Sequence, residues 1–353
     1  MDIHEATRAF ERWLGRHTRV FGPDLALKHR RMAESPFVFL RGTFYRWMQL
    51  WPEVCAELRD SPRVLAVGDL HVENFGTWRD NEGRLVWGVN DVDEASRLPY
   101  TVDLTRLATS ALLAIEATHF SLSGRAACEA ILDGYRASLD CGGRPFVLAE
   151  HRRWLRRIAM NELRDPAVFW PKLTGGPAVR GPLPHSALRA MLPDRGLAYR
   201  AARRVAGVGS LGRPRFVAIA NWGGALIARE AKAAVPSASE WVRGRSAAAM
   251  QCEPILARAI RVRDPFFAVR GGWIVRRLAP DCTRIELVDL PKGRDEARLL
   301  HAMGWETANL HLGTPTARVA ADLKRRPKRW LEEAAVHMAR ATTRDWRDWR
   351  KGR

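Results

Sequence analysis

Two stretches of the chain show short apolar runs separated by polar turns, the pattern that predicts β-strands. In the first, residues 65–93, the run LAV predicts a strand that leads into the polar loop GDLHVEN. A strand, the turn signal DNEG and the apolar strand LVWGV follow before the acidic loop NDVD. Two strands joined by a tight turn should therefore bring the two polar loops to one end of a ribbon.

The second stretch, residues 203–232, contains a G-x-G-x-x-G pattern. Its members are Gly207, Gly209 and Gly212, with Ser210 between them. In dinucleotide-binding proteins such a turn opens a helix. Here Pro214 and the apolar run RFVAIA follow, then the turn NWGG and a strand that ends near Lys232. We therefore predict strand, glycine loop, strand, turn, strand.

Helical spacing of apolar residues occurs around both stretches. The predicted helices lie within 1–34, 100–115, 124–139, 145–163, 237–261 and 295–314, with one or two basic helices after them. A hairpin around Gly271 and a strand at 273–278 extend the second stretch, and the Pro- and Gly-rich residues 165–194 predict a linker. The expected fold class is α+β.

Composition narrows the class of protein. The chain has 353 residues, of which 46% are hydrophobic, so it can bury a core. Its five cysteines lack metal-ligand spacing, and no apolar leader or membrane-length run is present, so we expect a reducing, cytoplasmic location without membrane contact. The net charge of +19 is typical of a protein with an acidic partner such as nucleic acid, or of an arginine-rich surface composition.

The polar loops of the first stretch carry candidate chemistry. Asp69 and Asn74 stand in the pattern D-x-x-x-x-N, and Asp91 follows one hairpin later. In kinase-type phosphotransferases such an aspartate accepts the substrate hydroxyl proton, while the asparagine and a later aspartate hold metal ions. Oxygen ligands of this kind suit Mg²⁺, which keeps water or phosphate as its other ligands. The alternative is that these side chains only cap and solvate the loops.

This stretch closely resembles the catalytic and metal loops of aminoglycoside and choline phosphotransferases, which read G-D-L-H-x-x-N and then I-D-x-x-D. The resemblance implies ATP and Mg²⁺ as cofactors, Asp69 as the catalytic residue, and Asn74 and Asp91 as metal ligands. The supporting candidates, for which a structural role is the alternative, are His71, Glu73 and Asp93. Two departures are Val67, where that group usually has His, and a longer span between the two loops.

Asp103, in LPYTVDLTRL, resembles an aspartate that braces the catalytic-loop backbone in the same phosphotransferases. The alternative is a helix N-terminal acid, which stabilises by about 0.3–1 kcal/mol.

The second stretch resembles the glycine-rich loop of kinases and the lysine that contacts the phosphates. Its glycines let backbone N–H groups approach phosphate, and Lys232 adds a point charge. The resemblance therefore implies that the glycine loop, with Ser210, and Lys232 bind the nucleotide. For the glutamate that kinases pair with this lysine, spacing favours Glu253 over Glu240, although Pro254 disfavours a helical backbone there. The alternative is an ordinary hairpin with a solvated lysine.

The segment RMAESPFVFLRG at 31–42 and the loop GDLHVENFG resemble two stretches of a bacterial family known as domain of unknown function 2252. The chain resembles that family over most of its length. Arg41, near the end of the segment, is a candidate phosphate contact or a structural arginine that closes a turn.

The kinase-like parts occur in an altered order, which predicts a circularly permuted, two-lobed protein-kinase-like fold. The expected domains are a catalytic-lobe part with the catalytic and metal loops at 1–164, a linker at 165–194, a β-rich nucleotide-binding lobe at 195–290, and C-terminal helices that return to the catalytic lobe at 291–353. ATP would bind between the lobes.

The resulting hypothesis is an ATP- and Mg²⁺-dependent phosphotransferase acting on an unidentified hydroxyl acceptor, either a small molecule or a protein. A nucleotide-binding pseudokinase and a kinase-fold nucleotidyl transferase are alternatives. A metal-dependent hydrolase or nuclease, with a metal cluster drawn from both polar loops and nucleic acid bound by the basic charge, would leave the glycine loop and Lys232 without a role.

Overall fold

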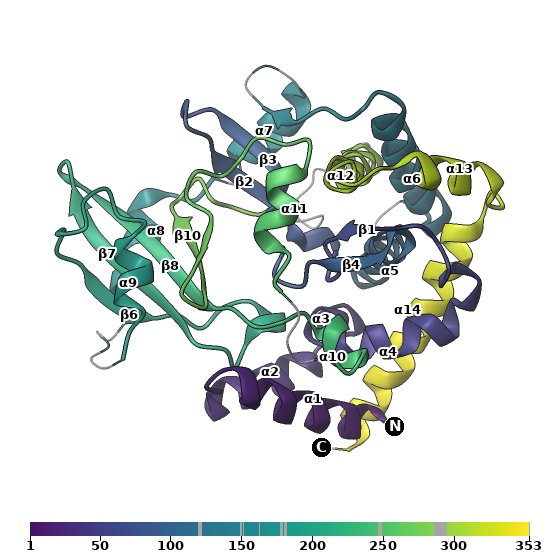
Figure 1. Cartoon of the computed structure of the whole chain (residues 1–353), viewed down its shortest axis with the longest axis horizontal. Helices are drawn as coiled ribbons and strands as arrows, with labels where there is room; N and C mark the ends of the chain where they lie inside the picture. The colour runs from purple at the N-terminus through teal and green to yellow at the C-terminus, as the bar shows by residue number, and fades with distance from the viewer. Residues whose placement is uncertain are drawn as a thin grey trace.

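The computed structural model describes the chain except for residues 119–121, 149, 151, 162, 177–178, 180–181, 246–248, 286–294 and 353. Its elements form a mixed α+β structure, which confirms the expected fold class. Figure 1 shows helices from both ends of the chain together in one part, and a five-stranded sheet from the middle of the chain beside them. None of the described helices is long and apolar enough to span a membrane.

Four helices open the chain: α1 (Ile3–His17), α2 (Gly22–Met32), α3 (Pro36–Gly42) and α4 (Phe44–Val54). Asp2 and Glu5 start α1 as a capping box, because each side chain accepts the backbone N–H of the other. Ser35 caps α3, and Pro36 provides a first helical residue with a fixed φ. The Ser-Pro pair in the sequence therefore marks a helix start.

The first stretch forms the expected ribbon. The short elements around it are η1 (Ala56–Leu58), β1 (Arg63–Ala66), η2 (Val72–Asn74), β2 (Phe75–Arg79), β3 (Leu85–Val89), β4 (Ser96–Pro99) and β5 (Phe146–Val147). β2 pairs antiparallel with β3, and β5 adds to β3, whereas β1 pairs with β4. The Asn90 N–H donates to the Asn74 carbonyl at 2.9 Å, so the two polar loops meet at one end of the hairpin.

The second stretch forms the five-stranded antiparallel sheet. Its strands, in spatial order, are β6 (Arg200–Arg203), β7 (Arg215–Trp222), β8 (Ala225–Ala233), β10 (Trp273–Leu278) and β9 (Ala268–Arg270). The glycine loop joins β6 to β7 and contains η3 (Val208–Ser210). The predicted order of strand, glycine loop, strand, turn, strand is confirmed.

We expected a linker at 165–194, and the structure instead has two helices there, α8 (Pro166–Thr174) and α9 (His185–Arg189). Leu188 of α9 packs with buried residues of β8 and β10, and Trp170 of α8 packs against another apolar cluster of the same sheet. The few apolar side chains among the prolines and glycines are therefore enough to dock this segment on the sheet.

The remaining helices are α5 (Tyr100–Thr118), α6 (Gly124–Asp140), α7 (Arg153–Asn161), α10 (Ala238–Val242), α11 (Cys252–Arg258), α12 (Asp295–His311), α13 (Ala317–Arg325) and α14 (Trp330–Lys351). α12 packs along α6 with no room for side chains at the crossing. A Cβ at Gly134 would lie 1.9 Å from the His301 carbonyl oxygen, and one at Gly304 would lie 2.0 Å from that of Ile131. This contact fixes the C-terminal helices against the first half of the chain.

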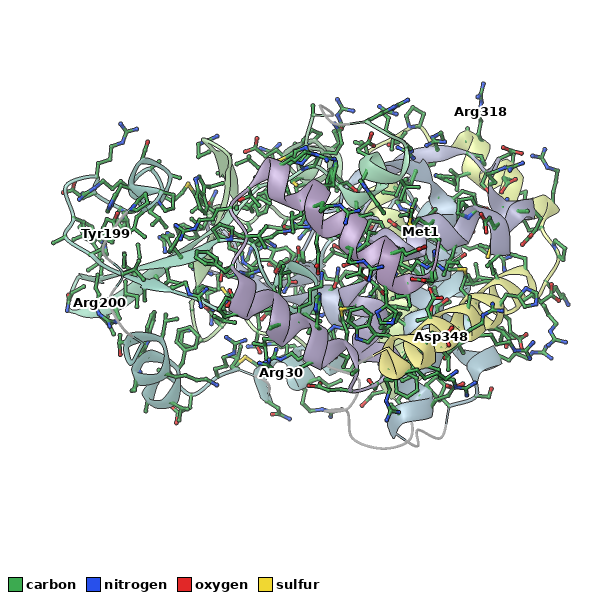
Figure 2. The ribbon with its side chains drawn as sticks, turned by 90° about the horizontal axis from the view of Figure 1, so that it is seen from below. Met1, Arg30, Tyr199, Arg200, Arg318 and Asp348 are labelled. Carbon is green, nitrogen blue, oxygen red and sulfur yellow. The ribbon has the colours of Figure 1, made fainter. Side chains whose placement is uncertain are left out.

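The two ends of the chain lie side by side (Figure 1). The His4 ring stacks on Trp349 with 4.9 Å between ring centroids, and His4 Nε2 lies 3.3 Å from the Asp348 carbonyl oxygen. Figure 2 shows Tyr199 and Arg200 of the sheet part at the end of the molecule opposite Arg318 and Asp348. Neighbouring termini are the condition under which a permuted chain can keep its fold.

Candidate functional site

The loop that carries Asp69 is held by a buried carboxylate at its start. Asp103, at the beginning of α5, accepts the backbone N–H groups of Val67 at 2.7 Å and Gly68 at 2.8 Å. It also lies 3.0 Å from Nε2 of His311, the last residue of α12. Both Asp103 and His311 are fully buried. The predicted bracing contact of Asp103 with the loop backbone is present, and α12 reinforces it.

Asp69 itself points from this loop toward the glycine loop. Its Oδ1 accepts two hydrogen bonds from Arg106, with Nε at 2.8 Å, and its Oδ2 lies 3.6 Å from the place of a Cβ on Gly209. Burial raises the pKa of Asp69 to about 6, the Arg106 guanidinium opposes this, and Glu94 adds to it. A carboxylate with this pKa is ionised at neutral pH and basic enough to accept a proton.

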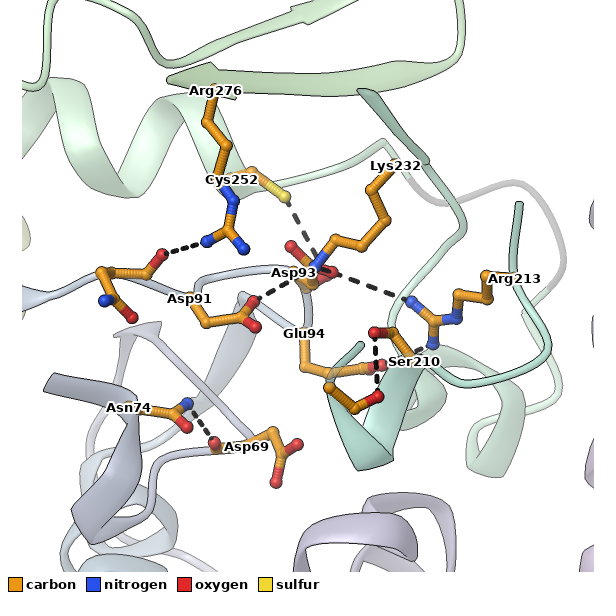
Figure 3. Close-up of polar contacts among 12 residues, drawn as sticks. Asp69, Asn74, Asp91, Asp93, Glu94, Ser210, Arg213, Lys232, Cys252 and Arg276 are labelled. Carbon is orange, nitrogen blue, oxygen red and sulfur yellow. Dashed lines mark hydrogen bonds and ion pairs between the residues drawn. The ribbon is translucent and has the colours of Figure 1, made fainter. Parts of the chain in front are cut away.

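Asn74 and Asp91 face each other across the hairpin end, as Figure 3 shows. The Asn74 amide donates to the Asp69 carbonyl at 2.7 Å, which leaves its side-chain oxygen available. Asp91 lies 3.5 Å from the Lys232 Nζ. Burial opposes ionisation of Asp91, but Lys232 and Arg276 lower its pKa far below the usual value. The structure therefore brings together the three residues of the predicted metal and catalytic set, Asp69, Asn74 and Asp91.

Lys232 lies on β8 with its side chain buried. It forms ion pairs with Asp91 and Asp93 of the acidic loop. Burial and the neighbouring Asp91 raise the pKa of Asp93. Arg213 supplies positive charge at the end of the acidic loop, because it donates to Glu94 at 3.0 Å and lies 4.0 Å from Asp93. Residues from distant parts of the sequence thus form one charged cluster (Figure 3).

The predicted pairing of Lys232 with Glu253 is wrong. Glu253 opens α11 at the far edge of the sheet, where it accepts the Val269 N–H at 2.8 Å and lies 3.8 Å from Arg270. Glu240 is also engaged elsewhere, with Ser96 and Arg243. The short α11 packs against β9 and α12, so its glutamate does not reach Lys232, although Glu253 does line a cavity that is described below.

The glycine loop lies directly on the loop that carries Asp69 and on the N-terminal helices. A Cβ on Gly209 would lie 2.9 Å from the Arg41 carbonyl oxygen, so only glycine allows this approach. Gly207 and Gly212 have φ of +75° and +96°, which favour glycine. Lys28 of α2 is buried and reaches the Gly209 carbonyl at 3.4 Å. Burial lowers the pKa of Lys28 to about 8, whereas Glu11 opposes the shift.

Arg41, His71 and Glu73 have structural partners. Arg41 pairs with Glu73 at 2.6 Å, and Arg284 lies 3.8 Å from the same carboxylate. Burial, Arg41 and Arg106 lower the pKa of His71 well below its usual value, so its ring is neutral at pH 7. Among the described residues, no three His, Cys, Asp or Glu side chains gather closely enough to hold a metal by themselves. The hydrolase alternative, which needs such a cluster, gains no support from this geometry.

A cavity of about 770 Å³ lies beside this cluster, between the sheet and the β2–β3 hairpin. Asp91, Gly207 and Arg276 line it together with the apolar side chains of Trp78 and Leu278. A smaller space of about 60 Å³ reaches Asp69 and shares Asp91 and Gly207 with the cavity. A ligand in the cavity would therefore lie next to the space that reaches Asp69.

Sequence reasoning missed several charged residues of the site. They are Lys28, Glu94, Arg106, Arg213 and Glu230. A signal existed for Arg106, because it lies three residues after Asp103 and so on the same helix face. It also existed for Glu230, two residues before Lys232 on one strand face. Lys28 carried no local signal, since its position depends on how α2 packs.

Residues 23–165 match the model of the family domain of unknown function 2252, described as an uncharacterized protein conserved in bacteria. The match spans Arg41, both polar loops and Asp103, and it confirms the predicted resemblance to this family over these residues, a shorter part of the chain than expected. No curated protein and no solved structure matches the chain.

Proposed function

We propose that the chain is an ATP- and Mg²⁺-dependent phosphotransferase that acts on a hydroxyl acceptor, with a permuted kinase-like arrangement of its site. The observation that carries this proposal is the contact of Lys232, on β8, the second strand after the glycine loop, with Asp91, which follows the β2–β3 hairpin. These residues are 141 positions apart in the chain. In kinases the corresponding lysine and aspartate act on the same phosphates.

The donor set fits Mg²⁺. Asp91 supplies an ionised carboxylate, and Asn74 has its amide nitrogen occupied, so that its oxygen is the free ligand atom. Two protein ligands are few, but Mg²⁺ commonly takes its remaining ligands from water and substrate phosphates. When bound, the metal would neutralise charge on the phosphates.

The residues of the chain provide the rest of the chemistry. The N–H groups of the glycine loop and Lys232 would bind the phosphates, and Arg106 and Asn74 hold Asp69 in place. Asp69 would accept the proton of the acceptor hydroxyl as the hydroxyl oxygen bonds to the γ-phosphorus of ATP and the bond from that phosphorus to the leaving ADP breaks. Phosphoryl transfer needs mainly positioning and charge stabilisation, and this cluster can supply both.

The direct test is calorimetric binding of ATP with and without Mg²⁺. We expect Lys232→Ala and Asp91→Asn each to weaken Mg²⁺-ATP binding by about 10- to 100-fold, since each removes a charged contact worth about 1.5–3 kcal/mol. Lys324→Ala, at an exposed lysine of α13, is the matched control and should bind as the wild type does. A folded wild-type protein that binds no nucleotide would rule out the proposed function.

The pH dependence of transfer should report Asp69. Because only the deprotonated carboxylate can accept a proton and burial raises its pKa to about 6, we expect kcat/KM to be constant above pH 7 and to fall tenfold per pH unit well below 6. Nucleotide affinity measured over the same range separates protonation of ATP from that of the protein. A profile that stays flat down to pH 5 would remove Asp69 from the role of base.

A further inference from the structure

The cavity beside Lys232 carries more positive charge than the proposed contacts with a triphosphate require. Among the described residues, eight arginines and only three acidic residues line it. Three of these arginines, Arg204, Arg215 and Arg276, share one carboxylate, that of the fully buried Glu230. The cavity wall therefore keeps a surplus of guanidinium charge in a partly buried setting, where uncompensated charge is costly.

This surplus lies on the same sheet face as Lys232. Glu230 and Lys232 are two residues apart on β8, and their direct neighbours across the sheet are Arg276 on β10 and Arg215 on β7. Lys232 and Arg215 thus lie opposite each other with like charges, an arrangement that destabilises a sheet unless an anion compensates it. Asp91 and Asp93 form ion pairs with Lys232, whereas the carboxylate that pairs with Arg215 among the described residues is the shared Glu230.

An uncharged ligand group placed against this face, such as the base of a nucleotide, would remove water from the guanidinium groups without giving them a counter-charge. A phosphate would accept their N–H groups, because the planar guanidinium matches phosphate oxygens in a bidentate geometry. Arg204 and Arg276 keep 26% and 24% of their side-chain surfaces exposed, so they can contact a ligand directly. Apolar side chains of the lining include Trp78, Phe267 and Leu278.

We propose that Arg204, Arg215 and Arg276 form a second phosphate-binding subsite, so that the ligand of this cavity carries a phosphate in addition to those that contact Lys232. This inference rests on the proposed nucleotide-binding function and specifies its ligand class: a nucleotide with a further phosphate, either on its ribose or at the end of a longer phosphate chain. The guanidinium cluster would then serve as the second of two anion sites in one cavity.

The test compares ligand pairs that differ by one phosphate, by titration calorimetry on the full chain. If the phosphate that contacts the subsite lies on the ribose, we expect adenosine 3′,5′-bisphosphate to bind about tenfold or more tightly than AMP. If this phosphate instead extends the phosphate chain, we expect adenosine tetraphosphate to bind more tightly than ATP by the same factor. In Arg204→Gln, the ratio of the two affinities in the pair that shows the gain should fall close to one. Arg270→Gln, at an exposed arginine of β9 outside the cavity lining, should preserve it.

Wild-type protein that binds AMP and ATP but gains nothing from either added phosphate would overturn the subsite and leave the proposed function intact. Failure to bind any nucleotide would instead contradict the proposed function. A ratio that persists in Arg204→Gln would also overturn the subsite. The increase in affinity that the added phosphate gives the wild-type protein should also become smaller as the salt concentration is raised, because it comes from charge pairing. This measurement requires no variant.

Discussion

Asp69→Asn should strongly slow phosphoryl transfer while nucleotide binding stays close to that of the wild type. The amide can still accept the hydrogen bond from Arg106, so the loop keeps its position, but it cannot take a proton. Loss of a general base costs about 10²–10⁴ in rate, and we expect kcat to fall by a factor in this range. The measurement is single-turnover transfer with any acceptor that the wild type phosphorylates, beside ATP titration of the same sample.

The design separates chemistry from binding because Asp69 does not touch the 770 Å³ cavity, whereas Asp91 lines both spaces. Asp91→Asn should therefore lose binding and turnover together, and Asp69→Asn should lose turnover alone. Asp133→Asn, at an exposed position of α6, serves as the matched substitution. Turnover at the wild-type rate in Asp69→Asn would mean that this carboxylate only organises the loop.

Asp103→Ala should destabilise the protein by about 3–5 kcal/mol, because it removes the acceptor of two buried backbone N–H groups and of the His311 ring. Each buried donor left without a partner costs about 1–3 kcal/mol. Since the free energy of unfolding of a domain is about 5–15 kcal/mol, this single change would remove a large part of it. Urea unfolding followed by tryptophan fluorescence gives the free energy of unfolding directly.

Two companion variants make this result specific. Asp133→Ala removes an exposed carboxylate of similar chemistry and should change the free energy of unfolding by less than about 0.5 kcal/mol. Asp103→Asn retains one acceptor oxygen and should be intermediate. A loss below about 1 kcal/mol in Asp103→Ala would show that the backbone amides of Val67 and Gly68 find other partners, and the bracing role would then be incorrect.

Much of the local structure could be predicted because it depends on neighbouring residues. The alternation of apolar runs and turns placed the β2–β3 hairpin, and the proline after the glycine loop correctly indicated a strand and not a helix. The spacing of Asp69 and Asn74 placed both on one loop, and the hairpin that follows had to return Asp91 to them. The bracing position of Asp103 followed from a resemblance that the hydrogen bonds to Val67 and Gly68 match.

The errors concern contacts between segments that are distant in the chain. Glu253 had suitable spacing, but α11 packs against β9, and its carboxylate is used there. The segment 165–194 had a linker composition, but its apolar residues found a sheet face that no local pattern could reveal. Arg106 and Lys28 enter the site only because α5 packs against the loop of Asp69 and α2 packs against the glycine loop.

The sequence by itself determined most of the elements, the residue types available for chemistry and the family resemblance of residues 23–165, since each of these depends on short-range patterns. The tertiary structure decided which charges meet. Lys232 lies on a strand and Asp91 in a loop 141 positions before it, and only the packing of the sheet over the hairpin makes them partners. The same sheet gathers three arginines around Glu230, because β7 and β10 place Arg215 and Arg276 on one face in register with β8, and Arg204 directly follows β6.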